Sequence, residues 1–247
     1  MSTGLVVVAV VLGAALLSMP VFALVERGRR DADARRKGSS FLLGGGDFLI
    51  HWFMWAISPA ERALVRLGAT PDQMNAAGLA FGLLGGVLVG LGHLEAGGGA
   101  IALAGTCDVL DGRLARARGL ASAYGKFIDS TLDRFVETFA FLGFVAFYRD
   151  QPTGAFAAAA GLAGSMLVSY AQARGETVDV SGSGGLMQRA ERLVLTILGC
   201  LVDPSLSRAL GRPEGAVLLW VLGVIAAGSL GTAVYRTVWI ARKLRSR

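Results

Sequence analysis

The stretch that determines the fold is residues 107–135, CDVLDGRLARARGLASAYGKFIDSTLDRF. It carries the aspartates Asp108, Asp111, Asp129 and Asp133, although the sequence around it is strongly apolar. Carboxylates inside membrane-spanning helices are costly and by default mark a functional site. Asp108 and Asp111 are three residues apart and Asp129 and Asp133 are four apart, so each pair shares one face of a helix.

The residues between the two pairs predict a turn that joins antiparallel helices. If one helix ends at Gly119 and Ser122 caps the next, Asp111 and Asp129 each lie about 10 to 12 Å from the turn, at 1.5 Å per residue. Asp108 and Asp133 each lie about 16 Å from it, so the carboxylates meet in two matched layers. Such oxygen ligands suit divalent cations such as Mg²⁺, and two ions would bridge the phosphates of a nucleotide. The competing interpretation is that the acids pair with nearby arginines as structural glue.

The composition outside this stretch is that of an integral membrane protein. Of the 247 residues, 53% are hydrophobic and 17% charged, and the mean hydropathy is +0.56. These values exclude a disordered chain, a coiled coil, a secreted scaffold and an ordinary soluble domain. The net charge of +6 does not indicate nucleic acid, because the arginines cluster between apolar stretches, as in cytoplasmic loops. Cys107 and Cys200 lie far apart and are expected to be buried thiols.

The hydropathy pattern predicts an all-α protein with a core of six transmembrane helices. The predicted spans are residues 71–92, 99–118, 123–148, 153–173, 188–202 and 214–241. Counting crossings puts the arginine-rich connections on one side, which the positive-inside rule makes cytoplasmic. We therefore expect a protein of the cell (inner) membrane whose active site faces the cytoplasm. Gly82 and Gly86 have the spacing at which membrane helices pack closely.

The sequence before the core divides into two parts. Residues 1–25 are predicted to be an extra N-terminal transmembrane anchor, with a signal peptide as the alternative. Residues 26–67 form a basic linker and an amphipathic helix lying at the membrane interface, and residues 68–247 form the core domain. Ser58, Pro59 and Glu61 predict a helix start inside the interfacial segment, and Thr70 to Gln73 predict a capping box at the start of the first core span.

The acidic stretch resembles a known family signature. The motif D-x2-D-G-x2-A-R-x8-G-x3-D-x3-D of the CDP-alcohol phosphotransferases is matched by Asp108, Asp111, Gly112, Ala115, Arg116, Gly125, Asp129 and Asp133. The resemblance covers about residues 68–245 and not the N-terminal anchor. It implies a homodimeric six-helix membrane fold with an interfacial helix, and an enzyme that transfers a phosphoalcohol group from a CDP-linked donor to a second alcohol and releases CMP.

The resemblance also implies roles for individual residues. The metal ligands are Asp108, Asp111, Asp129 and Asp133, of which Asp133 is also the general base that takes the proton of the acceptor hydroxyl. The cytidine nucleotide is bound by Gly112, Ala115, Arg116 and Gly125, with Arg116 as a charged wall. The implied cofactor is Mg²⁺, as two ions, with Mn²⁺ as the substitute.

The acceptor is indicated by a second resemblance. SYAQARGE (residues 169–176) and RAER (residues 189–192) resemble elements of the phosphatidylinositol-phosphate synthase branch, S-Y-x-K-A-R-x-E and R-x-E-R, although Gln172 replaces the branch's lysine. In that branch arginines hold the phosphate of the acceptor, and the similar positions are Arg174, Arg192 and Arg236. The expected substrates are CDP-diacylglycerol and a phosphorylated polyol, with inositol phosphate first. Glycerol phosphate, inositol or an amino alcohol is the alternative acceptor, and a membrane cation transporter is the alternative of another class.

Overall fold

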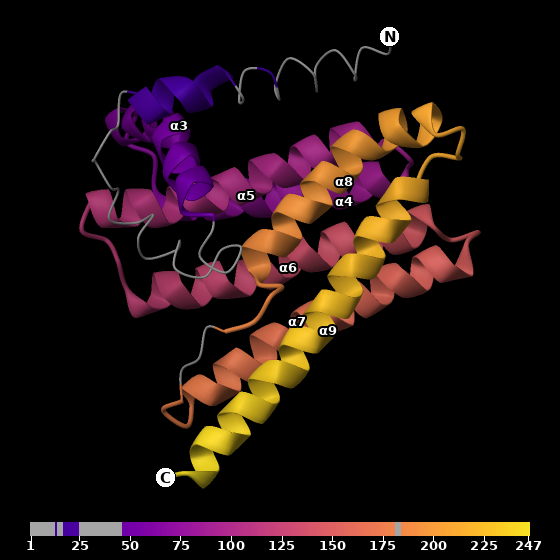
Figure 1. Cartoon of the computed structure of the whole chain (residues 1–247). Coiled ribbons are helices and arrows are strands. Elements are labelled where there is room, and N and C mark those ends of the chain that lie inside the picture. Colours follow the sequence, from indigo (N-terminus) through magenta and orange to yellow (C-terminus); the bar gives the residue numbers. More distant parts are fainter. Residues whose placement is uncertain (1–12, 14–16, 25–45, 181–183) are drawn as a thin grey trace.

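The computed structural model describes residues 13, 17–24, 46–180 and 184–247, and among these it contains helices and no strand (Figure 1). The helices are α3 (Asp47–Arg66), α4 (Pro71–Gly90), α5 (Leu94–Ala117), α6 (Ala123–Phe147), α7 (Pro152–Glu176), α8 (Arg189–Ala209) and α9 (Ala216–Arg245). The all-α prediction is confirmed. Most of the predicted N-terminal anchor and basic linker lies outside the described residues.

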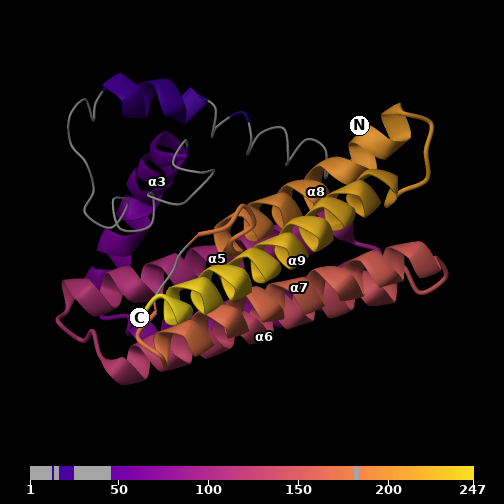
Figure 2. The same ribbon diagram turned by 60° about the horizontal axis from the view of Figure 1, so that its bottom comes forward.

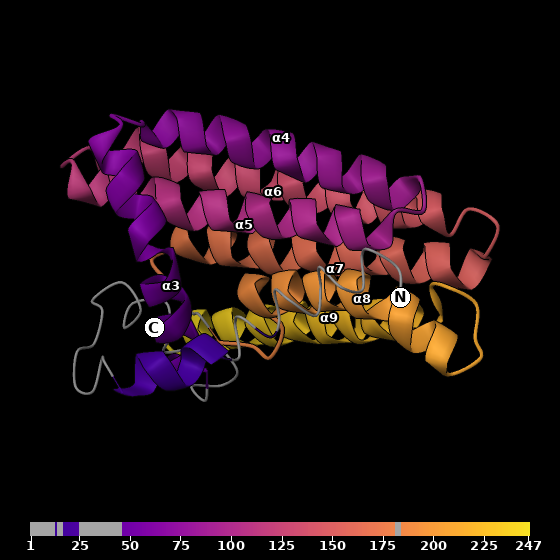
Figure 3. The ribbon, with the colours of Figure 1, turned by 90° about the horizontal axis from the view of Figure 1, so that it is seen from above.

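Helices α4 to α9 form a bundle in which the chain runs back and forth. The α6–α7 and α8–α9 connections lie at one end, whereas the start of α4, the α5–α6 turn and the chain's C-terminus lie at the other (Figures 1 and 3). The helix bounds follow the predicted spans closely, except that α5 starts earlier, at Leu94, and α8 continues to Ala209. The predicted cytoplasmic connections therefore share one end of the bundle.

Helix α4 is the central element of the first half of the bundle. It packs along both α5 and α6, while α5 and α6 contact each other much less. Glycines permit the close approach, because a Cβ added at Gly82 would lie 2.8 Å from Val136 Cγ2 and one at Gly86 would collide with the backbone of Phe139. The expected packing role of Gly82 and Gly86 is confirmed. Helices α5 and α6 are therefore held together mainly through α4.

Two predicted helix starts are confirmed and one is wrong. Thr70 Oγ1 accepts a hydrogen bond from Gln73 N at 3.2 Å while Thr70 N donates to Gln73 Oε1 at 2.9 Å, which completes the capping box. Ser122 caps α6 by accepting from Gly125 N at 3.1 Å. The start predicted at Ser58 does not exist, because α3 runs through Pro59.

The local chemistry explains how α3 tolerates its proline. Pro59 has no N–H, so the carbonyl of Trp55 cannot receive its usual helical hydrogen bond. The hydroxyl of Ser58 donates to that carbonyl at 2.8 Å instead. Ser58 thus acts inside the helix as a substitute donor and not as an N-cap.

Helix α3 stands at a steep angle to the bundle at the end where α5 turns into α6 (Figure 2). Its Met54 and Ile57 pack on Leu110 of α5. Glu61 accepts from Arg113 Nε of α5 at 2.5 Å. Residues 17–24 pack on the other side of α3, where the ring of Phe22 lies 5.5 Å from that of Phe48.

Hydropathy and length mark three helices of the described chain as candidate membrane spans, namely α4, α7 and α9. Helices α5, α6 and α8 contain more charged side chains, several of which belong to the site described next. The fold is thus an all-α bundle in which the apolar helices α4, α7 and α9 pack against helices that carry more charge.

At the opposite end of the bundle, α8 and α9 are joined around a buried aspartate. Asp203 of α8 is fully buried and accepts hydrogen bonds from the backbone N–H groups of Gly215, Val217 and Leu218 at 2.6, 2.8 and 2.8 Å. These groups belong to the first turn of α9, where N–H groups have no partner within the helix. The carboxylate therefore caps α9 from the neighbouring helix.

Candidate active site

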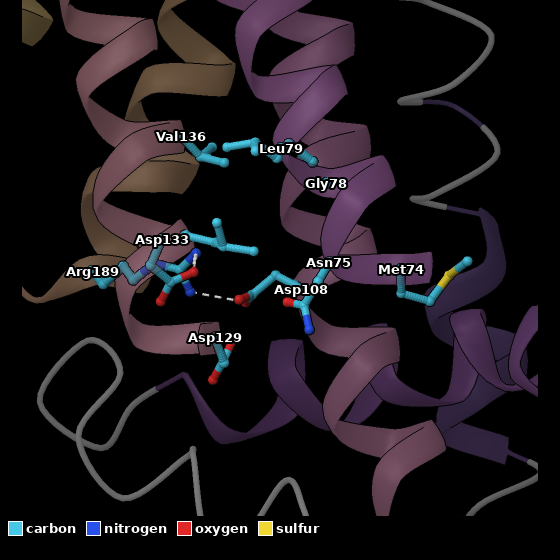
Figure 4. Close-up of a pocket in the computed structure, with 11 residues that line it drawn as sticks. Met74, Asn75, Gly78, Leu79, Asp108, Asp129, Asp133, Val136 and Arg189 are labelled. Carbon is cyan, nitrogen blue, oxygen red and sulfur yellow. Dashed lines mark hydrogen bonds and ion pairs between the residues drawn. The ribbon is translucent and has the colours of Figure 1, made fainter. Parts of the chain in front are cut away.

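A pocket lies between α4, α5, α6 and the start of α8, near the end of the bundle that carries the α5–α6 turn (Figure 4). Its uncharged wall comes mainly from α4 and α6, with the polar Asn75 and the apolar Met74, Gly78, Leu79, Ala104, Leu132 and Val136. Its charged residues are Asp108, Asp129, Asp133 and Arg189. The pocket occupies the gap between α5 and α6, and α4 closes it on one side.

Three of the predicted aspartates come together here, and two of them, Asp108 and Asp129, line the pocket. Asp108, Asp111 and Asp129 each offer a carboxylate oxygen, and these oxygens all lie within 4.8 Å of one another. The grouping follows from the short turn between the helices, in which Gly119 adopts a left-handed φ of +67° and Ser122 starts α6. Clustered carboxylate oxygens are the ligands that hard divalent cations prefer, so the residues fit a metal site.

Asp133 lies beside this cluster but is held differently. Its carboxylate forms an ion pair with Arg189 of α8, and the same guanidinium donates to Asp108 Oδ2 at 2.8 Å (Figure 4). Arg189 thus links α5, α6 and α8. Arg189 was not among the predicted site residues, although it is the first arginine of the RAER element and lies one helical turn before Arg192.

A second set of charges continues away from the pocket through Glu137. Its carboxylate accepts from Arg192 Nε at 2.7 Å and from Arg134 Nη1 at 2.8 Å. Arg134 also donates to Ser169 of α7 at 2.5 Å. Arg192 is 2% exposed, so this pairing compensates a charge that is almost fully buried.

The other two arginines predicted for the acceptor lie in different environments. Arg236 of α9 is buried and donates to the Gly184 carbonyl at 2.9 Å and to Gln172 Oε1 at 2.7 Å. Arg174 is exposed near the end of α7. The structure therefore places Arg192 and Arg236 inside the protein and Arg174 on its surface.

The residues predicted to bind the nucleotide lie along the two helices next to the aspartates. Gly112, Ala115 and Arg116 are on α5, and the Arg116 guanidinium lies over Gly112, where an added Cβ would be 3.2 Å from Nη1. At Gly125 an added Cβ would meet Ser122 Oγ as its nearest atom, at 3.5 Å, which is an ordinary contact. Packing within the chain does not require a glycine at 125, so this surface has room for a ligand.

The comparisons with known proteins agree with this geometry. Residues 69–202 match the family model described as CDP-alcohol phosphatidyltransferase. The phosphatidylinositol phosphate synthase of Streptomyces avermitilis is 34% identical over 199 residues, which are 78% of this chain and 80% of that protein. The enzyme of the same name from Mycobacterium tuberculosis is 34% identical over 189 residues, 74% of this chain and 85% of the relative.

Solved structures of the Mycobacterium tuberculosis phosphatidylinositol phosphate synthase have a similar fold. The structure with CDP-DAG bound has a TM-score of 0.64 and 31% identity, and the match covers 74% of this chain and 92% of that one. The structure in complex with manganese and citrate has a TM-score of 0.64 and 32% identity, with 73% and 88% covered. The similarity therefore extends over nearly the whole length of the solved chains.

Proposed function

The chain belongs to the CDP-alcohol phosphatidyltransferase family, and on that premise we propose that it transfers the phosphatidyl group of CDP-diacylglycerol to a hydroxyl of inositol phosphate and releases CMP. At the level of the family, the chain is a phosphotransferase of phospholipid biosynthesis that moves a phosphatidyl group to an alcohol. The observation that carries the proposal is the cluster of three carboxylates, from Asp108, Asp111 and Asp129, beside a set of inward-facing arginines.

The carboxylates hold divalent cations in this proposal. Asp108, Asp111 and Asp129 supply the ligands and Asp133 shares the site, with two Mg²⁺ ions as the cofactor and Mn²⁺ as a substitute. When bound, such ions neutralise phosphate charge and stabilise the departing CMP. The manganese in the related mycobacterial structure supports the choice of a hard divalent cation.

Asp133 is the general base. It lies next to the three-carboxylate group and is held by Arg189, which keeps its carboxylate at the pocket. It takes the proton from the acceptor hydroxyl as the oxygen attacks the β-phosphate of the donor, and the bond from that phosphorus to the CMP oxygen breaks. The nucleotide-binding side of the site is lined by Gly112, Ala115, Arg116 and Gly125, because the glycines leave space along α5 and α6.

Arginines hold the acceptor's phosphate. Arg192 and Arg236 are the buried members of this group and Arg174 is the exposed one. Arginine suits the task because its guanidinium binds phosphate through two donors and stays charged at any working pH. The relatives' name, phosphatidylinositol phosphate synthase, supports inositol phosphate over inositol, since only the phosphorylated alcohol has a group for these arginines.

The membrane arrangement completes the proposal. Helices α4 to α9 are six membrane spans, α3 lies at the membrane interface, and the active site opens to the cytoplasm from the inner membrane. The arginine-rich connections at the same end as the pocket support this orientation. The protein works as a homodimer, as the family resemblance implies.

The experiment is a CMP-release assay with purified protein, CDP-diacylglycerol and Mg²⁺. Inositol phosphate, inositol and glycerol phosphate are compared as acceptors against a sample without acceptor. We expect CMP only with an acceptor and the fastest release with inositol phosphate. Faster release with another alcohol would refute the acceptor, and no release with any acceptor would refute transferase activity.

A further inference from the structure

Arg189 is the charged residue whose position the proposed function does not explain. It is the first residue of α8, where a positive charge is unfavourable because the N-terminus of a helix carries a partial positive charge of its own. Its side chain is 30% exposed and reaches Asp108 and Asp133, each with 14% of the side chain exposed. The two carboxylates therefore account for the location of this guanidinium.

One of these two carboxylates is also a candidate metal ligand. Asp108 belongs to the group with Asp111 and Asp129 whose oxygens lie within 4.8 Å of one another, whereas Asp133 is outside that group. A divalent cation among those three oxygens needs Asp108 and repels a guanidinium bound to the same carboxylate. Because they share one carboxylate, a cation bound there and the guanidinium of Arg189 repel each other.

We propose that Arg189 is a positioning residue that exchanges with the divalent cation at the Asp108 carboxylate. The inference rests on the proposed function, because it takes the three carboxylates as the cation site. Arg189 then has two consequences: it lowers the affinity of the site for the cation, and it compensates the charge of the carboxylates before the cation arrives.

The test measures Mn²⁺ binding to the full-length protein in detergent by electron paramagnetic resonance. Arg189→Gln removes the competing charge and Arg189→Lys keeps a charge without the two-armed guanidinium. We expect Arg189→Gln to bind Mn²⁺ about tenfold more tightly than the original protein, a factor equivalent to about 1.4 kcal/mol, with Arg189→Lys in between. Arg208→Gln is the matched control, since Arg208 is exposed in the last turn of the same helix, and its affinity should be unchanged.

A second measurement separates exchange from a merely structural ion pair. In Arg189→Gln the apparent midpoint of thermal unfolding should fall without cation and should rise more on adding Mn²⁺ than in the original protein. The exchange would be overturned if Arg189→Gln bound Mn²⁺ no more tightly than the original protein. It would also be overturned if Mn²⁺ did not reduce the decrease in the unfolding midpoint of this variant.

The binding readout also separates this inference from the transferase activity. Tighter Mn²⁺ binding by Arg189→Gln, together with no CMP release by the original protein, would refute the proposed function and leave the exchange standing. Normal CMP release together with unchanged Mn²⁺ affinity in Arg189→Gln would refute the exchange alone. No Mn²⁺ binding by any of the proteins would overturn both the cation site and the exchange.

Discussion

Replacing Asp203 by alanine should destabilise the protein strongly without touching the active site. The Asp203 carboxylate is fully buried and accepts from the N–H groups of Gly215, Val217 and Leu218 and from the hydroxyl of Ser207 at 2.9 Å. Alanine removes all these acceptors at once. The buried N–H groups of Gly215 and Leu218 then have no acceptor, whereas Val217 keeps the hydroxyl of Ser207 at 3.2 Å.

The size of the effect follows from these contacts. Loss of an N-cap costs about 1 kcal/mol, and each buried donor left without an acceptor costs about 1 to 3 kcal/mol. The terms are not additive, because the donors share one carboxylate, so we expect a total of about 3 to 5 kcal/mol. For a chain of this size, about 2 to 4 °C of midpoint per kcal/mol gives a decrease of roughly 6 to 20 °C. Asp203→Asn keeps one acceptor oxygen, so its loss of stability should be about half that of Asp203→Ala.

The assay is the apparent midpoint of thermal unfolding in detergent, followed by tryptophan fluorescence. Asp150→Ala is the control, because the Asp150 side chain is 88% exposed on the α6–α7 connection at the same end of the bundle. CMP release by folded Asp203→Ala at low temperature should be close to that of the original protein. A midpoint within 2 °C of the original would refute the capping role, as would lost turnover at an unchanged midpoint.

Three further predictions concern the site and its support. Asp133→Asn should lower the rate of CMP release by at least about 100-fold while nucleotide binding largely persists, and an unchanged rate would remove Asp133 as the base. A chelator should stop CMP release and excess Mg²⁺ should restore it, whereas full activity in the chelator would exclude the cation. Glu61→Gln breaks the ion pair that ties α3 to Arg113 and should lower the unfolding midpoint by a few degrees. The Glu61→Gln/Arg113→Gln double variant should lose no more than either single variant, and additive losses would contradict this pairing.

Much of the fold could be predicted because its signals are local. Helix starts such as Thr70 to Gln73 and Ser122 depend on residues three positions apart, and the structure has both caps. The grouping of Asp108, Asp111 and Asp129 could also be predicted, since helical spacing and one short turn determine it. The family followed from the same residues, and the comparisons confirm it.

The missed features depend on contacts between distant segments. The role of α4 as a wall of the pocket arises because α4, and not α5, packs closely on α6. Arg189 reaches Asp108 across 81 positions of sequence, and its partners follow from the approach of α8 to α5, which the RAER element alone does not reveal. The helix start expected at Ser58 is absent, because the Ser58 hydroxyl replaces the donor that Pro59 lacks and the helix continues through both residues.

Structural glue and catalytic site, which the sequence offered as competing interpretations of the aspartates, are compatible in this structure. Charges of alternating sign follow one another from Asp108 to Arg189, Asp133, Arg134, Glu137 and Arg192. Ion pairs of this kind stabilise a membrane bundle only while every member has a partner, because removing one leaves a buried charge uncompensated. A cation at Asp108 therefore acts on the first residue of this series of charges. Glu137 holds Arg192, which is the last residue of the series. The pairs that tie α5, α6 and α8 together thus also connect the proposed cation site with the proposed acceptor site.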